Sequence, residues 1–266
     1  MIFFVLGCVS TTLSEEWNWS GNLFERNIEG FLPLQNAKLE LFTEDMVSIL
    51  ETEDNPQSPY RSLNLSEEYR DEEIIFVLNG DNCHQSLWKG TAPTTGDAIW
   101  LNGSLFAQGK AYQQLIMNSL GLMDVEPLTN PTTQEASPYA FFWGEPAKPE
   151  DWTGVSISAR LYSDEVLMDT GSSSEDTSSI QNQTTSITPL MYSLTDEGLF
   201  VEIESPISED LPLSLFIFPE LPTGSLELHV SRSSNLGEAF DITSTYPSTS
   251  GTWISAINFT LPAQSN

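Results

Sequence analysis

The hydrophobic pattern changes character near residue 150, and this change is the first guide to the fold. Before it, Glu73-Ile-Ile-Phe-Val-Leu78 is a continuous apolar run that ends at Asn79-Gly80. Such a run predicts a strand covered on both faces, and we expect it at the centre of a first domain. Residues 37–42 alternate apolar and polar side chains, which predicts a second strand. Residues 44–50 are expected to begin a short helix with acidic residues in its first turn.

An apolar helix is predicted over residues 109–123, and Gly121 is the kind of residue that ends such a helix. Its second half is apolar nearly all round, which predicts deep burial. Gln114 and Asn118 lie four residues apart and therefore share one face, where buried amides need hydrogen-bond partners. The connecting segments expected around it are an acidic surface loop at 51–73, a short strand at 98–101 and a Pro- and Thr-rich connection at 124–150.

After Trp152 the sequence consists of short runs of alternating apolar and polar residues, separated by turn residues. Strands at that spacing predict an all-β antiparallel sandwich over residues 151–266. Between the first two runs, residues 170–186 are rich in Ser, Thr, Asn and Gln, and we expect a disordered insert there because too few apolar side chains are available to pack. The predicted strands are 155–161, 199–203, 213–218, 225–230 and 253–259.

Composition indicates a folded protein and excludes one large class of function. The 266 residues are 39% hydrophobic, which is enough apolar material for real cores. Thirty-eight acidic residues against nine basic ones give a formal charge of −29. Because this charge repels phosphate backbones, nucleic-acid binding is excluded as a main function. Adaptation to a salty environment explains such an excess, which is a property of the whole surface and indicates no particular site.

The N-terminus carries a targeting signal in its simplest interpretation. Met1-Ile-Phe-Phe-Val-Leu-Gly-Cys8 resembles the lipobox of a bacterial-type lipoprotein, although its apolar region is short and no basic residue precedes it. We therefore expect a truncated signal over residues 1–8, lipidation of Cys8 and a tether over residues 9–30. The alternative is a frayed apolar N-terminus. The first interpretation places the protein outside the cytoplasm, in contact with the membrane only through a lipid anchor.

Few residues are available for metal or nucleophilic chemistry. The two cysteines, Cys8 and Cys83, do not form a zinc-binding pattern, and the two histidines, His84 and His229, come from separate regions. The chain has no G-x-S-x-G nucleophile motif. We therefore predict neither a metal nor another cofactor.

One segment nevertheless has the framework of a zinc-protease active site. The order of Cys83-His-Gln-Ser-Leu-Trp-Lys-Gly-Thr-Ala, Gly96-Asp-Ala-Ile-Trp-Leu-Asn-Gly103 and Gln114-Leu-Ile-Met-Asn-Ser-Leu-Gly-Leu-Met-Asp124 resembles the gametolysin-like metzincin peptidases over residues 72 to 145. The metzincin pattern is H-E-x-x-H-x-x-G-x-x-H. We align this pattern so that its glycine falls on Gly121. Gln114 and Asn118 then replace the two helical histidines, Leu115 replaces the general base, and Asp124 replaces the third zinc ligand.

The resemblance implies a metzincin-like fold that lacks the zinc ligands and the general base. A neutral amide is a poor zinc ligand and leucine cannot accept a proton, so no catalytic residue is expected. The implied fold class is α+β: a metzincin-like domain over 31–150, with a mixed sheet and an active-site-type helix, followed by the β sandwich. The helix should pack under the sheet that contains 73–78, with Gln114, Asn118 and Asp124 converging on a remnant cleft. The aromatic cluster in Tyr139-Ala-Phe-Phe-Trp-Gly144 lies where a Met-turn would be, and is either a filler beneath a vacant metal site or ordinary core.

The expected function is that of an exported, lipid-anchored and catalytically inactive peptidase-like protein, with a binding or structural role at the cell surface. Its expected partner is a peptide or protein ligand, and the sequence does not indicate an oligomeric state. Two alternatives stay open. One is an active hydrolase that uses unrecognised acidic residues, since paired carboxylates can perform acid-base catalysis. The other is a purely structural surface or stalk β protein.

Overall fold

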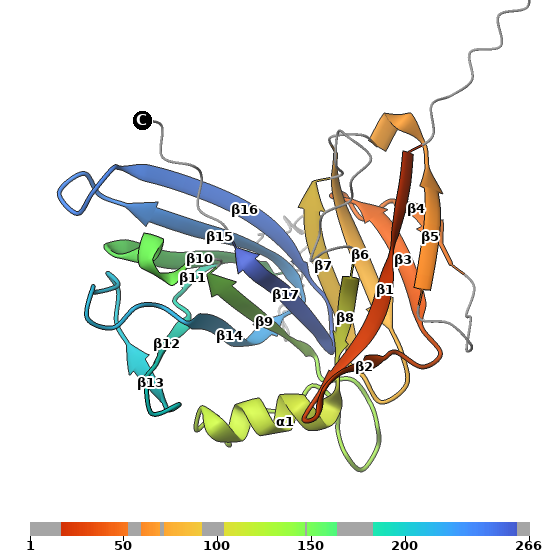
Figure 1. Cartoon of the computed structure of the whole chain (residues 1–266), viewed down its shortest axis with the longest axis horizontal. Coiled ribbons are helices and arrows are strands. Elements are labelled where there is room, and N and C mark those ends of the chain that lie inside the picture. The colour runs from red at the N-terminus through yellow and green to blue at the C-terminus, as the bar shows by residue number, and fades with distance from the viewer. Residues whose placement is uncertain are drawn as a thin grey trace, which may run out of the picture.

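The computed structural model describes residues 17–52, 60–69, 72–91, 104–146, 148–163 and 183–259. Within these ranges it has seventeen strands, and α1 (Lys110–Ser119) is their one α-helix. The protein is therefore mostly β, which corrects the expected α+β class (Figure 1). No helix of the described part is long and apolar enough to cross a membrane.

Nine strands form a central sheet in the order β13-β12-β14-β9-β17-β7-β6-β3-β4. β17 lies between β9 and β7 and runs parallel to both. β9 precedes residue 150, whereas both of its neighbours in the sheet, β14 and β17, follow that residue. The strand pairing therefore crosses the boundary expected between residues 31–150 and 151–266. That boundary falls inside one sheet. The bounds are β3 (Lys38–Thr43), β4 (Ser48–Glu51), β6 (Glu73–Asn79), β7 (Gln85–Thr91), β9 (Tyr139–Pro146), β12 (Leu190–Leu194), β13 (Phe200–Ile203), β14 (Leu215–Pro222) and β17 (Thr252–Phe259).

A four-stranded antiparallel sheet in the order β11-β10-β15-β16 packs against one face of the central sheet. The aromatic core between the two sheets includes Phe142, Phe216 and Tyr246. Two β-sheets packed face to face are what the alternating runs after residue 152 predict, although β17 joins the central sheet by parallel pairing. The bounds are β10 (Val155–Ser163), β11 (Gln183–Ile187), β15 (Gly224–Arg232) and β16 (Phe240–Ser248).

The opposite face of the central sheet is covered by two different elements. A small sheet of β1 (Trp17–Asn27), β2 (Gly30–Pro33), β5 (Tyr60–Leu65) and β8 (Ser104–Gln108) covers the end that contains β6. Helix α1 covers the part formed by β9, β14 and β17. Consequently, the fold has three layers with the nine-stranded sheet in the middle.

The buried strand β6 confirms the prediction made from its apolar run. Ile75 and Val77 belong to the core under the four-stranded sheet, whereas Ile74, Phe76 and Leu78 belong to the core under the small sheet. Since successive side chains of a strand point to opposite faces, a strand between two cores must be apolar at every position. The other predicted strands at 37–42, 155–161, 199–203, 213–218, 225–230 and 253–259 correspond, with shifted ends, to β3, β10, β13, β14, β15 and β17.

Several local predictions in the N-terminal part were wrong. Residues 17–27, expected in a tether over 9–30, form β1, which pairs with three other strands of the small sheet. Residues 44–50 do not begin a helix, because a tight turn with Met46 at φ 60° leads into β4. The acidic loop expected at 51–73 contains β5 and a 3₁₀ turn, η1 (Glu67–Tyr69).

The insert expected at 170–186 lies outside the described residues up to 182, but residues 183–186 belong to β11. The strand expected at 98–101 also lies outside them. Helix α1 is shorter than the predicted 109–123 and buries only one face, through Gln113, Ile116 and Met117. Deep burial all round was therefore a wrong prediction.

Candidate functional site

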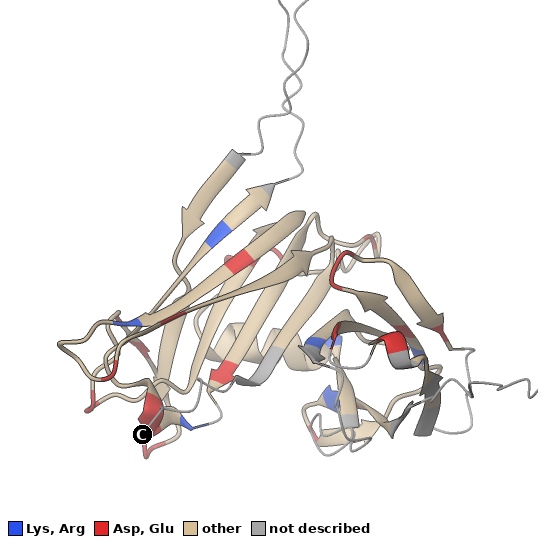
Figure 2. Ribbon diagram, turned by 90° about the horizontal axis from the view of Figure 1, so that it is seen from above, with Lys and Arg blue, Asp and Glu red and all other residues tan. Residues whose placement is uncertain are grey.

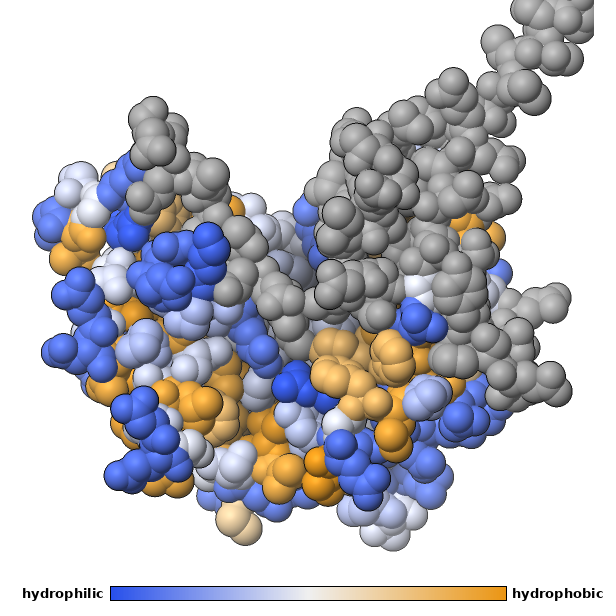
Figure 3. Space-filling model, viewed as in Figure 1, coloured by the Kyte–Doolittle hydropathy of each residue, from blue (hydrophilic) through white to orange (hydrophobic). Residues whose placement is uncertain are grey.

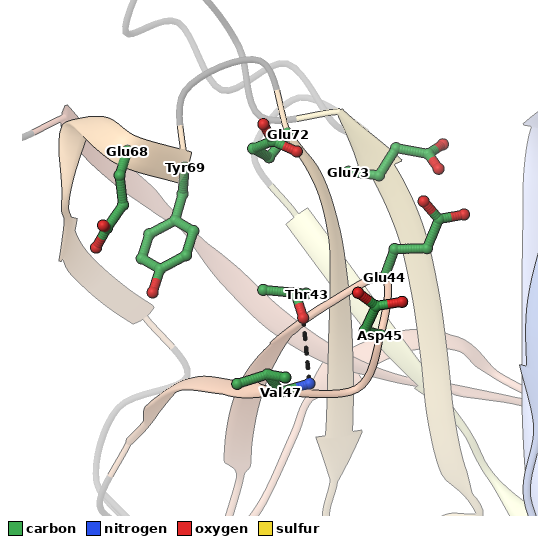
Figure 4. A pocket seen from close by; sticks show the side chains of 8 residues that line it. All are labelled: Thr43, Glu44, Asp45, Val47, Glu68, Tyr69, Glu72 and Glu73. Atoms are coloured by element: carbon green, nitrogen blue, oxygen red, sulfur yellow. Dashed lines mark hydrogen bonds between the residues drawn. The ribbon is translucent and has the colours of Figure 1, made fainter.

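A pocket of about 640 Å³ opens between β3, η1 and the start of β6. Five of its eight lining residues are acidic, and we call it the acidic pocket. Figure 4 shows Glu68 and Tyr69 on one side, with Glu44, Asp45 and Glu73 on the other. Among the described residues the lining is formed by Thr43, Glu44, Asp45, Val47, Glu68, Tyr69, Glu72 and Glu73.

The floor of the acidic pocket is a tight turn fixed by its own hydrogen bonds. The Val47 backbone N–H donates to Thr43 Oγ1 at 3.1 Å, and the Thr43 N–H donates to the Val47 carbonyl at 2.9 Å (Figure 4). Across the pocket, Tyr69 packs against the core beneath the small sheet, and its carbonyl accepts the Glu72 N–H at 3.3 Å. These hydrogen bonds fix the backbone of the turn that carries Glu44 and Asp45 and join Tyr69 to Glu72.

Lys89 on β7 connects one wall of the acidic pocket to the four-stranded sheet. Its Nζ lies 3.0 Å from Glu44 Oε1 and 2.8 Å from Glu73 Oε2, and it donates to the Thr245 carbonyl at 2.6 Å. Its side chain is only 4% exposed, and its Nζ lies 5.5 Å from the centre of the Tyr246 ring. Burial, helped by the charge of Glu73, raises the pKa of Tyr246. Lys89 therefore holds the two carboxylates at the wall while their outer sides stay accessible.

The remaining carboxylates give the acidic pocket a preference for positive charge. Five carboxylates surround it and one buried ammonium group compensates two of them, so a cation entering from solvent is attracted. Tyr69 adds an aromatic ring suited to stacking with a guanidinium group. In Figure 2 acidic residues also appear in turns of the rest of the fold, which contributes a weaker attraction at long range.

The residues that the metzincin resemblance singled out lie elsewhere. Gln114 Nε2 donates to Asn118 Oδ1 at 3.1 Å, but both side chains are exposed on the outer face of α1. Leu115 is 44% exposed, and Asp124 is exposed in the loop after the helix. The helix does pack on the central sheet that contains 73–78, as expected, but against β9, β14 and β17 rather than β6. The acidic pocket contains none of these four residues.

The aromatic cluster expected at the Met-turn position is part of the core. Phe141 and Trp143 pack with Ile116 and Met117 of α1, and the Phe141 ring stacks on Trp253 at 4.5 Å. In the described residues no group of three or more His, Cys, Asp or Glu side chains is arranged to hold a metal ion. Cys8 lies outside the described residues.

Comparisons with protein-family models and with curated proteins find no match. Among solved structures, the Bacillus anthracis TIE protein is 8% identical with a TM-score of 0.25; the match covers 91% of this chain and 33% of that one, so this chain spans a third of its length. The shaft pilin SpaA of Lactobacillus rhamnosus GG is 7% identical with a TM-score of 0.23, covering 95% of this chain and 100% of the pilin. A double mutant of the same pilin is 8% identical with a TM-score of 0.21, with the same coverage.

Sequence reasoning missed the acidic pocket because its walls come from three separate segments. One signal was present: in Leu87-Trp-Lys89 the lysine shares a strand face with a core leucine. A lysine at such a position has to find a carboxylate partner when it is buried. The acidic residues of the chain were too many for the right partners to be picked from sequence.

Proposed function

We propose that this protein is a non-catalytic β-sheet protein of the cell surface that binds a positively charged segment of a partner in its acidic pocket. The observation that carries the proposal is the pocket itself, in which five carboxylates line a space of about 640 Å³ above a hydrogen-bonded turn. This volume matches a site for several side chains or a small molecule, and is far larger than a single metal ion needs.

The chemistry of the pocket specifies the partner more closely. A Lys or Arg side chain can pair with Glu68, which lies opposite the wall that Lys89 holds, or with Glu72 beside Glu73, and both carboxylates are exposed (Figure 4). Spaced carboxylates on both sides suit an extended basic peptide, with one cationic side chain directed to each side. Apolar side chains are also exposed on the β1–β2 hairpin at Ile28, Phe31 and Leu32, but this apolar area lies at the end of the small sheet away from the acidic pocket (Figure 3).

Binding of a hexalysine peptide to the full chain tests this proposal. We expect the double substitution Glu68→Gln with Glu72→Gln to weaken binding about tenfold in fluorescence anisotropy at low salt, because close charge pairs are lost. The matched control is Asp196→Asn with Glu197→Gln in the exposed β12–β13 turn, which changes the net charge equally and should leave the affinity unchanged. Equal weakening by both variants would show that only the overall charge attracts the peptide.

The surface location is a separate part of the proposal and depends on Cys8. We expect Cys8→Ser to move the protein from the membrane fraction to the soluble fraction of its host cells, since a thioether-linked lipid can no longer be attached. Fractionation with immunodetection measures the change. An unchanged distribution would exclude anchoring through Cys8 and leave the acidic pocket proposal intact.

A further inference from the structure

Five side chains between α1, β8 and the central sheet carry polar atoms that are buried and have no hydrogen-bond partner among the described residues. The atoms are His84 Nε2, Gln108 Nε2 and Oε1, Gln113 Nε2, Trp253 Nε1 and Ser255 Oγ. None of the five residues is more than 4% exposed. Native proteins leave few buried polar atoms unpaired, and a bound water molecule or ligand is the common explanation where several occur together.

β8 crosses the face of the central sheet and positions Gln108 next to His84, the residue before β7. The Trp88 Nε1–H donates to the Phe106 carbonyl at 2.9 Å, and the Gln108 N–H donates to Ser86 Oγ at 3.0 Å. The His84 N–H donates to the Gln108 carbonyl at 2.8 Å, which sets these two residues opposite each other. Both side chains therefore lie in the layer between β8 and the sheet.

Helix α1 and β17 supply the other three side chains. Gln113 lies on the buried face of α1, one turn before Met117, and its carboxamide lies beside the His84 ring. Trp253 is the register partner of Ser86, and Ser255 is the partner of Trp88 on the same face. Trp253 packs with Ile116 and Met117 of α1, so this side chain lies beneath the helix. The five buried side chains therefore belong to the layer that α1 and β8 cover on this face of the central sheet.

We propose that these five side chains line an internal site, the α1–β8 site, that binds a small uncharged molecule bearing oxygen atoms. Three of the unpaired atoms, the two amide nitrogens and the indole nitrogen, can only donate, so the bound molecule must offer acceptors. Ser255 Oγ and Gln108 Oε1 can accept, so it must also donate. Water and a small polyol share this chemistry.

The absence of formal charge among the site residues explains why the bound molecule is uncharged. Burial lowers the pKa of His84 to about 4, so that its imidazole is neutral at pH 7, and the adjacent Gln113 carboxamide opposes this shift. Of the nearby cations, Arg26 is already paired with Glu145 at 3.5 Å and lies over the Tyr112 and Phe106 rings. Lys110, whose charge also lowers the pKa of His84, is exposed to solvent. An ion at the site would therefore be buried without a counter-charge.

Thermal unfolding of two glutamine variants of the full chain tests the site. Gln113→Leu removes a buried amide that the bound molecule would satisfy, so we expect the Tm to fall by about 4 °C or more. Gln114→Leu, the neighbouring exposed position, is the control and should change the Tm by about 1 °C or less. An unchanged or raised Tm in Gln113→Leu would contradict the proposal, because it would mean that no bound molecule satisfies the Gln113 amide. If Gln113→Leu does not fold, Trp253→Phe removes the indole N–H while keeping an aromatic ring.

A crystal structure of the full chain at about 1.5 Å, from crystals grown without polyol, decides the proposal directly. We expect density within about 3.5 Å of at least two of the three donor nitrogens. A second crystal soaked in glycerol distinguishes the bound molecules, since exchange of that density for glycerol indicates a polyol site and persistence of the original peaks indicates structural water. Absence of density in both crystals would overturn the proposal.

Discussion

Replacing Trp253 with alanine is expected to lower the free energy of unfolding by about 3–5 kcal/mol, the usual range for a fully buried tryptophan. Trp253 is 0% exposed, stacks on Phe141 at 4.5 Å and lies 5.8 Å from the Trp143 ring. Its strand, β17, connects β7 to β9. The loss should therefore destabilise both halves of the chain together, and urea unfolding followed by fluorescence and circular dichroism measures it.

The control for this experiment is Leu199→Ala, because Leu199 is 60% exposed before β13 and its truncation should change stability by about 0.5 kcal/mol or less. The two probes should give the same transition in the parent and in Trp253→Ala. Two separated transitions, with only the C-terminal one shifted, would show that the halves on either side of residue 150 fold independently.

The second large effect is expected at Gly144, where a methyl group would overlap the ring of Phe216. Gly144 lies in β9 opposite Phe216 of β14, and that ring is 0% exposed between the central sheet and the four-stranded sheet. Because the ring has little space to move, Gly144→Ala should cost about 1–3 kcal/mol or more through overpacking. Urea unfolding of the single variant measures this cost.

A double-mutant cycle identifies the cause. Phe216→Leu on its own should be destabilising, but combined with Gly144→Ala it should cost clearly less than the sum of the two, since the smaller side chain leaves room for the methyl group. The same comparison with Phe218→Leu, whose residue is buried nearby in the same strand, is the control and should be closer to additive. Strict additivity at Phe216 would mean that the methyl group meets something else.

The sequence predicted those elements whose pattern is local. The apolar run at 73–78 indicated a strand covered on both faces, and β6 has that environment because alternate side chains enter two cores. The alternating runs after residue 152 indicated sheets packed face to face. β1 was missed because its sequence, Trp-Asn-Trp-Ser-Gly-Asn-Leu-Phe-Glu-Arg-Asn, lacks a clear period, and its pairing with β5 and β8 joins segments far apart in the chain.

For a similar reason, the absence of a domain boundary at residue 150 could not be predicted from a local sequence pattern. Nothing in Thr252–Phe259 shows that the strand inserts between β7 and β9, about 165 and 110 residues earlier in the chain. The change in the hydrophobic pattern at residue 150 does not mark a separation of cores, because the core under the four-stranded sheet contains Ile75 and Phe142 together with Phe216 and Ile254. A sheet that combines both ends of a chain therefore appears in the sequence as two domains.

The candidate sites show the same limit. The predicted face of α1 does carry Gln114 and Asn118 side by side, but the opposite face is the buried one, with Gln113. Gly121 is the first residue after the helix cap and has φ 72°, as a helix-ending glycine should, which accounts for the Leu-Gly-Leu phrase without a metal site. Lys89 and the acidic pocket depend on side chains from four elements and could be found only in three dimensions.

Both proposed sites depend on the nine-stranded sheet, and backbone nuclear Overhauser effects test that sheet most directly. Ile254 in β17 is the register partner of Leu87 in β7 and of Phe142 in β9. The account predicts backbone contacts from Ile254 to both strands, together with slow hydrogen exchange of its amide. Contacts to one strand only, or rapid exchange at Ile254, would contradict a sheet shared by the two halves of the chain.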